Sequence, residues 1–210
     1  MAASPFDDGV NVDFEDPTPP EEKIELEKSW CFWHDKYKGV EQTAEEFRHS
    51  QKRFFSFSTV QKFWHCFNAL PATTSLPFKS SYHLMRKGVR PVWEDPENEN
   101  GGFWVLRFDR ETADAVWKEL CVALIGEHFD GVLKSGDMVN GVTVSVRRED
   151  AVIQIWNKIA IGEAENKVLF NHVKNKILKD YEIIKYFYKA CKQHSSYDGQ
   201  LREKLTVEVI

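Results

Sequence analysis

The sequence lacks the features of membrane-spanning, secreted and disulfide-stabilised proteins. No apolar run approaches the roughly 20 residues that a transmembrane helix needs, and no basic segment followed by an apolar stretch opens the chain. The chain has only 4 cysteines in 210 residues, and none forms a CxxC pair. Because all of them have apolar or aromatic neighbours, we expect buried thiols in a reducing environment. These absences predict a cytoplasmic protein without a membrane span or a disulfide framework.

An excess of positive charge is absent too. The formal net charge is −5 at pH 7, which argues against general electrostatic binding of nucleic acid. Acidic residues are concentrated in residues 1–28, where Pro17, Pro19 and Pro20 interrupt any helix or strand. We therefore expect a disordered acidic N-terminal tail, followed by one folded domain over residues 29–210. The domain itself is close to neutral, so basic clusters can still form locally on it.

Signatures of catalysis and of metal binding are missing as well. The 7 histidines form no HxxxH pair and match no pair of cysteines, so we assign no metal ion and no other cofactor. The sequence contains no glycine-rich phosphate loop, no GxSxG nucleophile motif and no suitable pair of metal-binding carboxylates. We expect a binding protein and not an enzyme.

What the chain does have is a high aromatic content, with 15 Phe and 7 Trp. Aromatic and β-branched residues at extended spacing predict strands at residues 30–36, 52–57, 81–87, 104–108, 142–148, 152–157 and 183–190. A last short strand is expected at residues 206–210. Apolar residues at helical spacing predict helices at residues 58–70, 112–127 and 164–179. Ser58 and Gln61 form the pattern of a capping box at the start of the first helix.

Turns, and not helices, separate most neighbouring strands. Residues 98–102 and 140–141 carry the Asn and Gly typical of such turns, so most strand pairs should be antiparallel. Three helices are too few to cover both faces of so wide a sheet. The sequence therefore predicts an α+β fold, a curved and mostly antiparallel sheet with the helices on one face. A ligand would bind on the other face.

The stretch RPVWEDPENENGGFW, residues 90–104, places a tryptophan and a carboxylate side by side in a loop, Trp93 and Glu94. Guanine presents N1–H and N2–H₂ on one edge, and a carboxylate can accept both hydrogen bonds. A guanine methylated at N7 also carries a positive charge, which favours stacking on an indole ring. The alternative is a turn whose tryptophan packs back on a strand, and spacing alone does not decide between the two.

Two other groups of residues have both a functional and a purely structural interpretation. Arg147 and Arg148 follow a predicted strand, where they could bind phosphates or be solvated surface charges. They point to opposite faces, so at most one of them faces a given ligand. The apolar arc of the first helix is very wide and includes Val60 and Trp64. Such an arc is either fully buried or leaves an exposed edge for a partner. Val122, on the second helix, lies on a different face from the core residues of that helix.

Six segments of the chain match those of a known family in order and spacing: SWCFW (29–33), STVQKFW (58–64), GVRPVWEDPENENGGFW (88–104), LIGEHF (124–129), GVTVSVR (141–147) and IQIW (153–156). On these segments the chain resembles translation initiation factor 4E, the protein that binds the 7-methylguanosine cap of messenger RNA. The resemblance runs from about Ser29 to Lys192.

The resemblance implies an eight-stranded sheet shaped like a cupped hand, with three helices on its convex back and the cap pocket on its concave side. It implies that Trp93 stacks on the methylated guanine and that Glu94 pairs with N1 and N2 of the base. By the same resemblance, Trp156 lies near the N7 methyl group and Arg147 contacts the phosphates.

Three departures from the family pattern lie in or near the cap site. The family's second stacking tryptophan, in the first loop, aligns with Phe47. Apolar residues, Phe103 and Val152, stand where the family commonly has basic ones. These departures resemble the divergent third class of the family, and they predict a thinner phosphate clamp and weaker cap binding.

The resemblance also implies a partner surface on the back of the sheet. Family members bind helical YxxxxLΦ peptides of a scaffold protein or of competing repressors there. Val60, Trp64 and Glu119 match the contact positions, and Val122 stands where leucine is usual. The family's His-Pro segment is replaced by Ile24 and Glu25, which weakens the match to part of the scaffold contact.

Together these features lead us to expect a monomer that binds capped mRNA and recruits the scaffold. The alternative is a weak cap-binding competitor that represses translation and engages the scaffold poorly.

Overall fold

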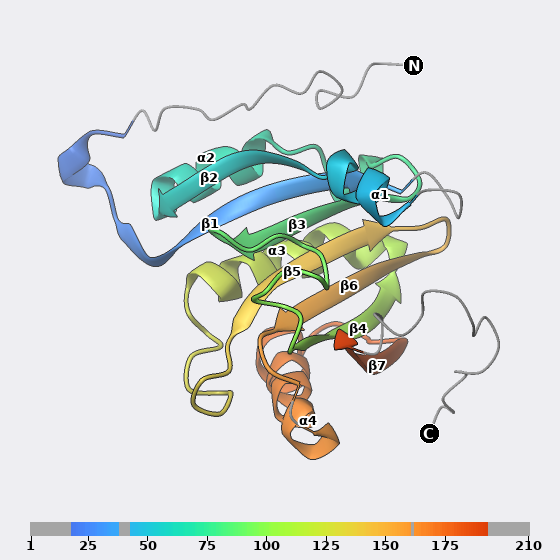
Figure 1. Ribbon diagram of the computed structural model, residues 1–210. Helices are drawn as coiled ribbons and strands as arrows, with labels where there is room; N and C mark the ends of the chain where they lie inside the picture. Colours follow the sequence, from blue (N-terminus) through green and yellow to red (C-terminus); the bar gives the residue numbers. More distant parts are fainter. Residues whose placement is uncertain (1–17, 38–42, 161, 193–210) are drawn as a thin grey trace.

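The protein folds around one twisted antiparallel β-sheet (Figure 1). The computed structural model describes residues 18–37, 43–160 and 162–192. Seven strands lie in the order β2-β1-β3-β5-β6-β4-β7, and every neighbouring pair is antiparallel. The strands are β1 (Glu25–Lys36), β2 (Lys52–Thr59), β3 (Ser80–Arg86), β4 (Gly102–Asp109), β5 (Val139–Val146), β6 (Asp150–Asn157) and β7 (Lys185–Ala190).

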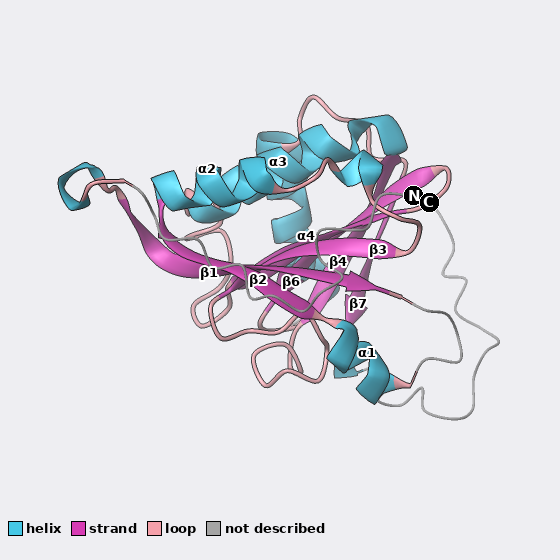
Figure 2. Ribbon diagram, turned by 90° about the horizontal axis from the view of Figure 1, so that it is seen from above, coloured by secondary structure: helices cyan, strands magenta, loops and turns pink. Residues whose placement is uncertain are grey.

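The described residues form four α-helices, and three of these cover one face of the sheet. Figure 2 shows α2 and α3 above the sheet and α1 on its opposite side. Side chains of α4 join the same hydrophobic core as those of α2 and α3, so α4 lies on their face. The helices are α1 (Ala44–Ser50), α2 (Val60–Ala69), α3 (Ala113–Ile125) and α4 (Glu163–His172), the last continued by a π-helical turn (Val173–Ile177). We call the face away from α2, α3 and α4 the open face. Within the described ranges, no helix is long and apolar enough to cross a bilayer.

Strand alternation divides the apolar side chains between the two faces. On β6, Ile153 and Ile155 belong to the large core under the helices, whereas Val152 and Trp156 belong to a smaller cluster on the open face. Successive side chains of a strand point to opposite faces, so a strand with apolar residues in both phases supplies both clusters. The sheet therefore has a second, local apolar site on the face that lacks the three helices.

Aromatic rings fill much of the large core. The ring centroid of Phe32 lies 5.4–6.4 Å from five other aromatic rings, those of Phe54, Phe57, Phe63, Phe67 and Trp117. These distances are typical of favourable aromatic contacts. Most of the aromatic content therefore serves packing between the sheet and its helices.

The predicted α+β architecture is confirmed, and the start of its first strand is corrected. The described residues form seven strands where eight were expected, and the strand predicted at residues 206–210 lies outside them. Strand β1 begins at Glu25, ahead of the boundary expected at residue 29. The early start has a physical reason, because Glu25 pairs with Thr59 of β2 and Leu26 packs against the core.

The start of α2 differs from the predicted capping box. The N-cap is Thr59 and not Ser58, because the Thr59 hydroxyl accepts a hydrogen bond from the Lys62 amide at 3.1 Å. The Gln61 side chain reaches back to the N-terminal segment, where it accepts from the Ile24 amide at 3.0 Å.

Helix α1 was not predicted. Its capping box, Thr43 with Glu46, is a local signal that could have revealed it.

One histidine is buried on the helix side of β1. His34 is 9% exposed and packs against Tyr82, with ring centroids 5.8 Å apart. Burial, which disfavours the charged ring, lowers its pKa to about 4, although the nearby Asp35 acts in the opposite direction. The folded state therefore takes up this proton only at a lower pH than the unfolded state does.

We predict that the protein loses stability as the pH falls from about 6.5 to about 4, because the unfolded chain binds the His34 proton first. The contribution of this group is roughly 3 kcal/mol. The His34→Phe variant should keep the packing on Tyr82. Its free energy of unfolding, measured by urea unfolding across that pH range, should lose this part of its dependence on pH. If the unfolding free energy of His34→Phe depends on pH as that of the wild-type protein does, the effect does not come from His34.

Candidate functional site

The small apolar cluster on the open face brings distant parts of the sequence together. Its buried members are Met85, Val89, Phe103, Val105, Val152, Trp156 and Cys191. Trp33 and Trp93, both partly exposed, pack against it. Two tryptophans predicted from the sequence, Trp93 on a loop and Trp156 on β6, therefore meet at one place.

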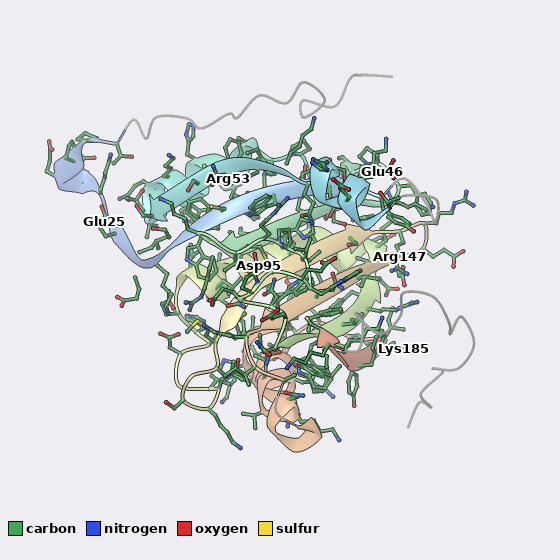
Figure 3. All side chains as sticks on the ribbon, viewed as in Figure 1. Glu25, Glu46, Arg53, Asp95, Arg147 and Lys185 are labelled. Atoms are coloured by element: carbon green, nitrogen blue, oxygen red, sulfur yellow. The ribbon has the colours of Figure 1, made fainter. Side chains whose placement is uncertain are left out.

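The loop between β3 and β4 carries Trp93 and passes in front of the sheet, with Asp95 near its centre (Figure 3). The buried carboxylate of Asp95 accepts hydrogen bonds from the amides of Arg90 and Glu97, each at 2.9 Å. The buried Asn98 donates from its side chain to the Arg90 and Val92 carbonyls, also at 2.9 Å. The acidic and amide residues of the loop thus satisfy its backbone and give it a defined shape.

Two further side chains fasten this loop to the body of the protein. Asn140 of β5 donates to the Glu97 carbonyl at 2.7 Å and to the Asn98 side-chain oxygen at 3.0 Å. Gln51, just before β2, donates to the Pro91 carbonyl at 3.1 Å. The loop is therefore formed before a ligand arrives, which lowers the entropy cost of binding.

The carboxylate of Glu94 is exposed at the rim of the apolar cluster. Burial raises the pKa of the Cys191 thiol to about 12, and the negative charge of Glu94 adds to the effect. Cys191 is therefore an unreactive member of the cluster, and Glu94 lies near it. A ring face and an acceptor-only carboxylate thus stand together, the arrangement that a flat base with donors on one edge requires.

A buried hydrogen-bonded chain fixes Trp156. Its indole N–H donates to the Thr143 hydroxyl at 3.0 Å, and that hydroxyl lies 2.8 Å from Nδ1 of His83. Nε2 of His83 lies 2.8 Å from Oδ2 of Asp35. An ionised carboxylate can only accept, so Nε2 of His83 carries a proton. With a neutral ring, Nδ1 accepts from Thr143, and each group in the chain has a partner.

The two apolar departures from the family pattern lie inside the cluster. The ring of Phe103 lies 4.6 Å from that of Trp156 between centroids, and Phe103 is 3% exposed. Val152 is 4% exposed. Both side chains are buried members of the cluster, and Phe103 contacts the ring of Trp156 directly.

Arg147 and Arg148 follow the end of β5, and Figure 3 shows Arg147 by the turn that connects β5 and β6. Both are exposed. Arg110 holds their turn in place, since its guanidinium donates to the Arg147 carbonyl at 3.1 Å and to the Thr74 carbonyl at 3.0 Å. Trp156 and the arginines thus lie toward opposite ends of β5 and β6, and Val152 of the cluster lies close to the arginine end.

Phe47, the predicted second stacking residue, belongs to α1. This helix lies on the side of the sheet away from α2 and α3 (Figure 2). The side chain of Phe47 is not among the described ones, so a role in stacking stays a prediction.

The predicted partner residues lie on α2 and α3. Val60, Trp64 and Val122 are partly exposed and Glu119 is exposed. The ring of Trp64 packs edge-on against Phe63, with centroids 4.9 Å apart. Its other contacts leave it at the surface, so full burial of Trp64, the structural alternative, does not occur.

A cavity of about 310 Å³ lies beside this surface, between α2 and α3. Phe67, Leu70, Trp117 and Lys118 are among its lining residues. The ammonium group of Lys118 lies 5.7 Å from the centre of the Trp64 ring. Lys118 therefore lies between the cavity and the partly exposed tryptophan. The surface thus offers an apolar hollow beside a ring with a positive charge over it.

Sequence reasoning missed several residues of the open face. Trp33 lies beside the cluster, and the Arg90 guanidinium stands 5.9 Å from the centre of its ring. His83 and Thr143 were not singled out either. Strand alternation could not have found them, because it fixes the face only within one strand, and the register of the sheet places His83 and Thr143 near Trp156.

The described residues contain no group of three or more His, Cys, Asp or Glu side chains that could hold a metal ion.

Comparison with known proteins points to one family. The model of a family described as "Eukaryotic initiation factor 4E" matches residues 25–204.

Curated relatives agree with that match. The chain is 36% identical over 117 residues to "Eukaryotic translation initiation factor NCBP" of Triticum aestivum, which covers 56% of this chain and 49% of that protein. It is 35% identical over 140 residues to "Eukaryotic translation initiation factor isoform 4E" of Capsicum annuum, covering 66% and 67%. The chain thus spans about half the length of the wheat relative.

A solved structure has the same fold. In the complex of C. elegans eIF4E-3 with the 4E-binding protein Mextli and cap analog, the matching chain superimposes with a TM-score of 0.70 at 28% identity. The match covers 83% of this chain and 96% of that one.

The buried pair Asp35 and His83 gives a stability prediction. The His83→Leu variant leaves the Asp35 carboxylate buried without its histidine partner, and it should lose about 3–5 kcal/mol of unfolding free energy. The double variant Asp35→Leu/His83→Leu removes the buried charge and should recover most of that loss. Denaturant unfolding of both variants measures the difference. A double variant less stable than His83→Leu would contradict this account of the pair.

Proposed function

The chain belongs to the eukaryotic initiation factor 4E family, and on that premise we propose that it binds the 7-methylguanosine cap of messenger RNA. We further propose that it recruits scaffold or regulatory proteins in translation initiation. It is a binding protein and not an enzyme, in keeping with its family. Its expected working state is a cytoplasmic monomer.

The meeting of Trp93, Glu94 and Trp156 on the open face carries the cap proposal. Trp93 packs against the apolar cluster that contains Trp156, and Glu94 is exposed at the rim. In the proposed complex, the guanine stacks on Trp93 and donates N1–H and N2–H to Glu94. Trp156, held by its hydrogen bond to Thr143, faces the N7 methyl group.

The phosphates of the cap would extend from this cluster toward Arg147. That direction follows β6 and β5, from the row of Trp156 to the turn held by Arg110. Arg147 is exposed there and offers a planar set of donors suited to phosphate oxygens. Phe47, on α1 at the same side of the sheet, is the proposed second stacking residue.

A weak cap-binding competitor that represses translation is the second candidate function. The observation that favours it is the burial of Phe103 and Val152, at 3% and 4% exposure, where a phosphate clamp would need charge. Each missing exposed charge contact removes at most about 1 kcal/mol of binding, less at high salt. The two candidates share one cap site and differ in affinity and in recruitment.

The proposed partner surface lies on α2 and α3, with Val60, Trp64, Glu119 and Val122 as its contact residues. A YxxxxLΦ helix would place its apolar side chains on Trp64 and Val122. Its N-terminus, the positive end of the helix dipole, would lie near Glu119. The C. elegans relative, which was solved with a 4E-binding protein, supports the expectation of a protein partner.

We predict that Glu94→Ala weakens binding of 7-methylguanosine triphosphate by roughly 2–4 kcal/mol, because two charge-assisted hydrogen bonds lose their acceptor. Isothermal titration calorimetry at fixed salt measures the change. Glu99, another exposed carboxylate of the same loop, supplies the matched control, and Glu99→Ala should bind like the wild-type protein. If Glu94→Ala keeps wild-type affinity, the base-binding site lies elsewhere.

For the partner surface, we predict that Trp64→Ala lowers the affinity for a YxxxxLΦ peptide by at least about tenfold, as expected for an aromatic anchor. Binding of 7-methylguanosine triphosphate should not change, because Trp64 lies on the helix side of the sheet. Val168→Ala, an apolar truncation on α4 at a residue 49% exposed, is the control. Equal peptide binding by Trp64→Ala and the wild-type protein would refute the assignment.

A further inference from the structure

A cluster of exposed rings and positive charges lies where β1 and β5 end and β3 begins. We call it the end patch, and its residues are Tyr37, Phe78, Lys79 and Arg148. Phe78 is 51% exposed and Tyr37 is 39% exposed. The Lys79 ammonium lies 5.5 Å from the Tyr37 ring centre and 5.6 Å from that of Phe78, and the Arg148 guanidinium lies 5.6 Å from the Phe78 ring. Large exposed rings with cations over them are unusual on a surface that serves only solubility.

The end patch continues the row of open-face residues that leads away from Trp156. Trp156 pairs with Gly141 of β5, and β5 then runs to the turn of Arg147 and Arg148. The stretch from Gly141 to Arg147 is about 20 Å long at the rise of an extended strand. The patch therefore begins where the phosphates of the proposed cap complex would end.

Strand pairing brings the other residues of the patch to the same end. Ser81 of β3 pairs with Ser145 of β5, and their hydroxyl oxygens lie 2.8 Å apart. One step further, the Tyr37 amide donates to the Lys79 carbonyl at 2.8 Å, which extends the pairing of β1 with β3. Residues from three strand ends, far apart in the sequence, thus form one surface beside Arg147.

The backbone of Lys79 is held in an unfavourable conformation. Its φ is +66°, in the left-handed region that glycine and asparagine tolerate far better than lysine does. The Ser80 amide donates to the Pro77 carbonyl at 3.0 Å and closes the turn. A lysine in this conformation costs stability, and such positions cluster at functional sites.

The surroundings of the patch favour an anionic ligand. Arg147 adds a third exposed cation to Lys79 and Arg148, and Arg110 lies under the turn of the two arginines. Of the neighbouring carboxylates, Asp150 is paired with Arg107 at 3.1 Å, and Glu149 is exposed. In a chain with a net charge of −5, this is a local concentration of positive charge.

We propose that the end patch binds the first nucleotides of the RNA body, those that follow the cap. The bases stack on Phe78 and Tyr37, while Lys79 and Arg148 contact the phosphates between them. This inference rests on the proposed cap site, because that site sets where the chain of the RNA emerges. It goes beyond cap recognition, since it makes the protein a reader of capped RNA and not only of the cap nucleotide.

Single-stranded RNA suits the patch better than an acidic peptide does. A peptide carboxylate would use the cations and leave two exposed ring faces without a role. A nucleotide uses both, because every base has a flat face that can stack and every linkage has a charged phosphate. Stacking also explains why the cations stand over rings that remain accessible.

The test compares three ligands at fixed salt: 7-methylguanosine triphosphate, a capped RNA of about five nucleotides and the same RNA without its cap. For the wild-type protein we expect the capped RNA to bind about tenfold tighter than the cap nucleotide, the gain typical of one stacked base. Phe78→Ser and Arg148→Ser should each remove most of that gain and leave the affinity for the cap nucleotide unchanged. Phe78→Trp should retain it.

Lys79→Gly separates a binding role from a structural one. Glycine accepts the left-handed conformation, so this variant should melt at a higher temperature than the wild-type protein and yet lose RNA affinity. Two controls lie on the helix-covered face: Lys118→Ser, which removes another cation over a ring, and Tyr186→Ser, at a ring 43% exposed. Both should keep the full gain.

The outcomes are distinguishable. If the cap nucleotide does not bind, the proposed function fails, whatever the RNA does. If the cap nucleotide binds but capped RNA binds no more tightly than it, the end patch does not bind RNA. The same conclusion follows if Phe78→Ser and Arg148→Ser keep the higher affinity for capped RNA. If an oligoglutamate of similar charge displaces the RNA body as well as an uncapped RNA does, the patch is an acidic-peptide site and the proposal is overturned.

Discussion

Four strands of the sheet are tied across the open face by one buried chain of hydrogen bonds. It runs from Asp35 on β1 through His83 and Thr143 to the indole of Trp156 on β6. The open face lacks the layer of three helices that fixes side chains on the other side, so rigidity there must come from polar contacts within the sheet. A buried polar chain of this kind stabilises the fold only when every member has its partner. The same requirement holds Trp156 in a single orientation.

The loop that carries Trp93 follows the same logic on a smaller scale. Its backbone amides and carbonyls form hydrogen bonds with the side chains of Asp95 and Asn98. The loop ends at Gly101 and Gly102, where β4 begins. A Cβ on Gly101 would collide with the Asn157 carbonyl oxygen, and one on Gly102 with that of Lys189. Polar residues of the loop thus serve its shape, while the ring of Trp93 packs on the apolar cluster with Glu94 at the rim. The site combines a rigid floor with a rigid loop.

Much of the fold could be predicted because the strands have clear alternation and are separated by turn residues. The start of β1 at Glu25 could not, since it depends on pairing with a distant segment, and the seven-residue helix α1 has only one short capping signal, which was overlooked. For the site, the adjacency of Trp93 and Glu94 singled these residues out but left a structural turn as an equal alternative, and the family resemblance supplied their expected role. The chain through His83 was not, because its members come from four strands and only the register brings them together. Phe103 and Val152 were expected only as missing charges, and their burial against Trp156 required the structure.

The central claim is that the open-face cluster recognises a cationic methylated guanine. The most direct measurement is a fluorescence titration of the wild-type protein, in parallel, with 7-methylguanosine triphosphate and with the unmethylated nucleotide. Stacking of a charged base on Trp93 should quench tryptophan emission, and the methylated nucleotide should bind at least about tenfold tighter, the expected size of a desolvated cation–π contribution. Equal affinity for the two nucleotides, or no saturable quenching with either, would contradict the account.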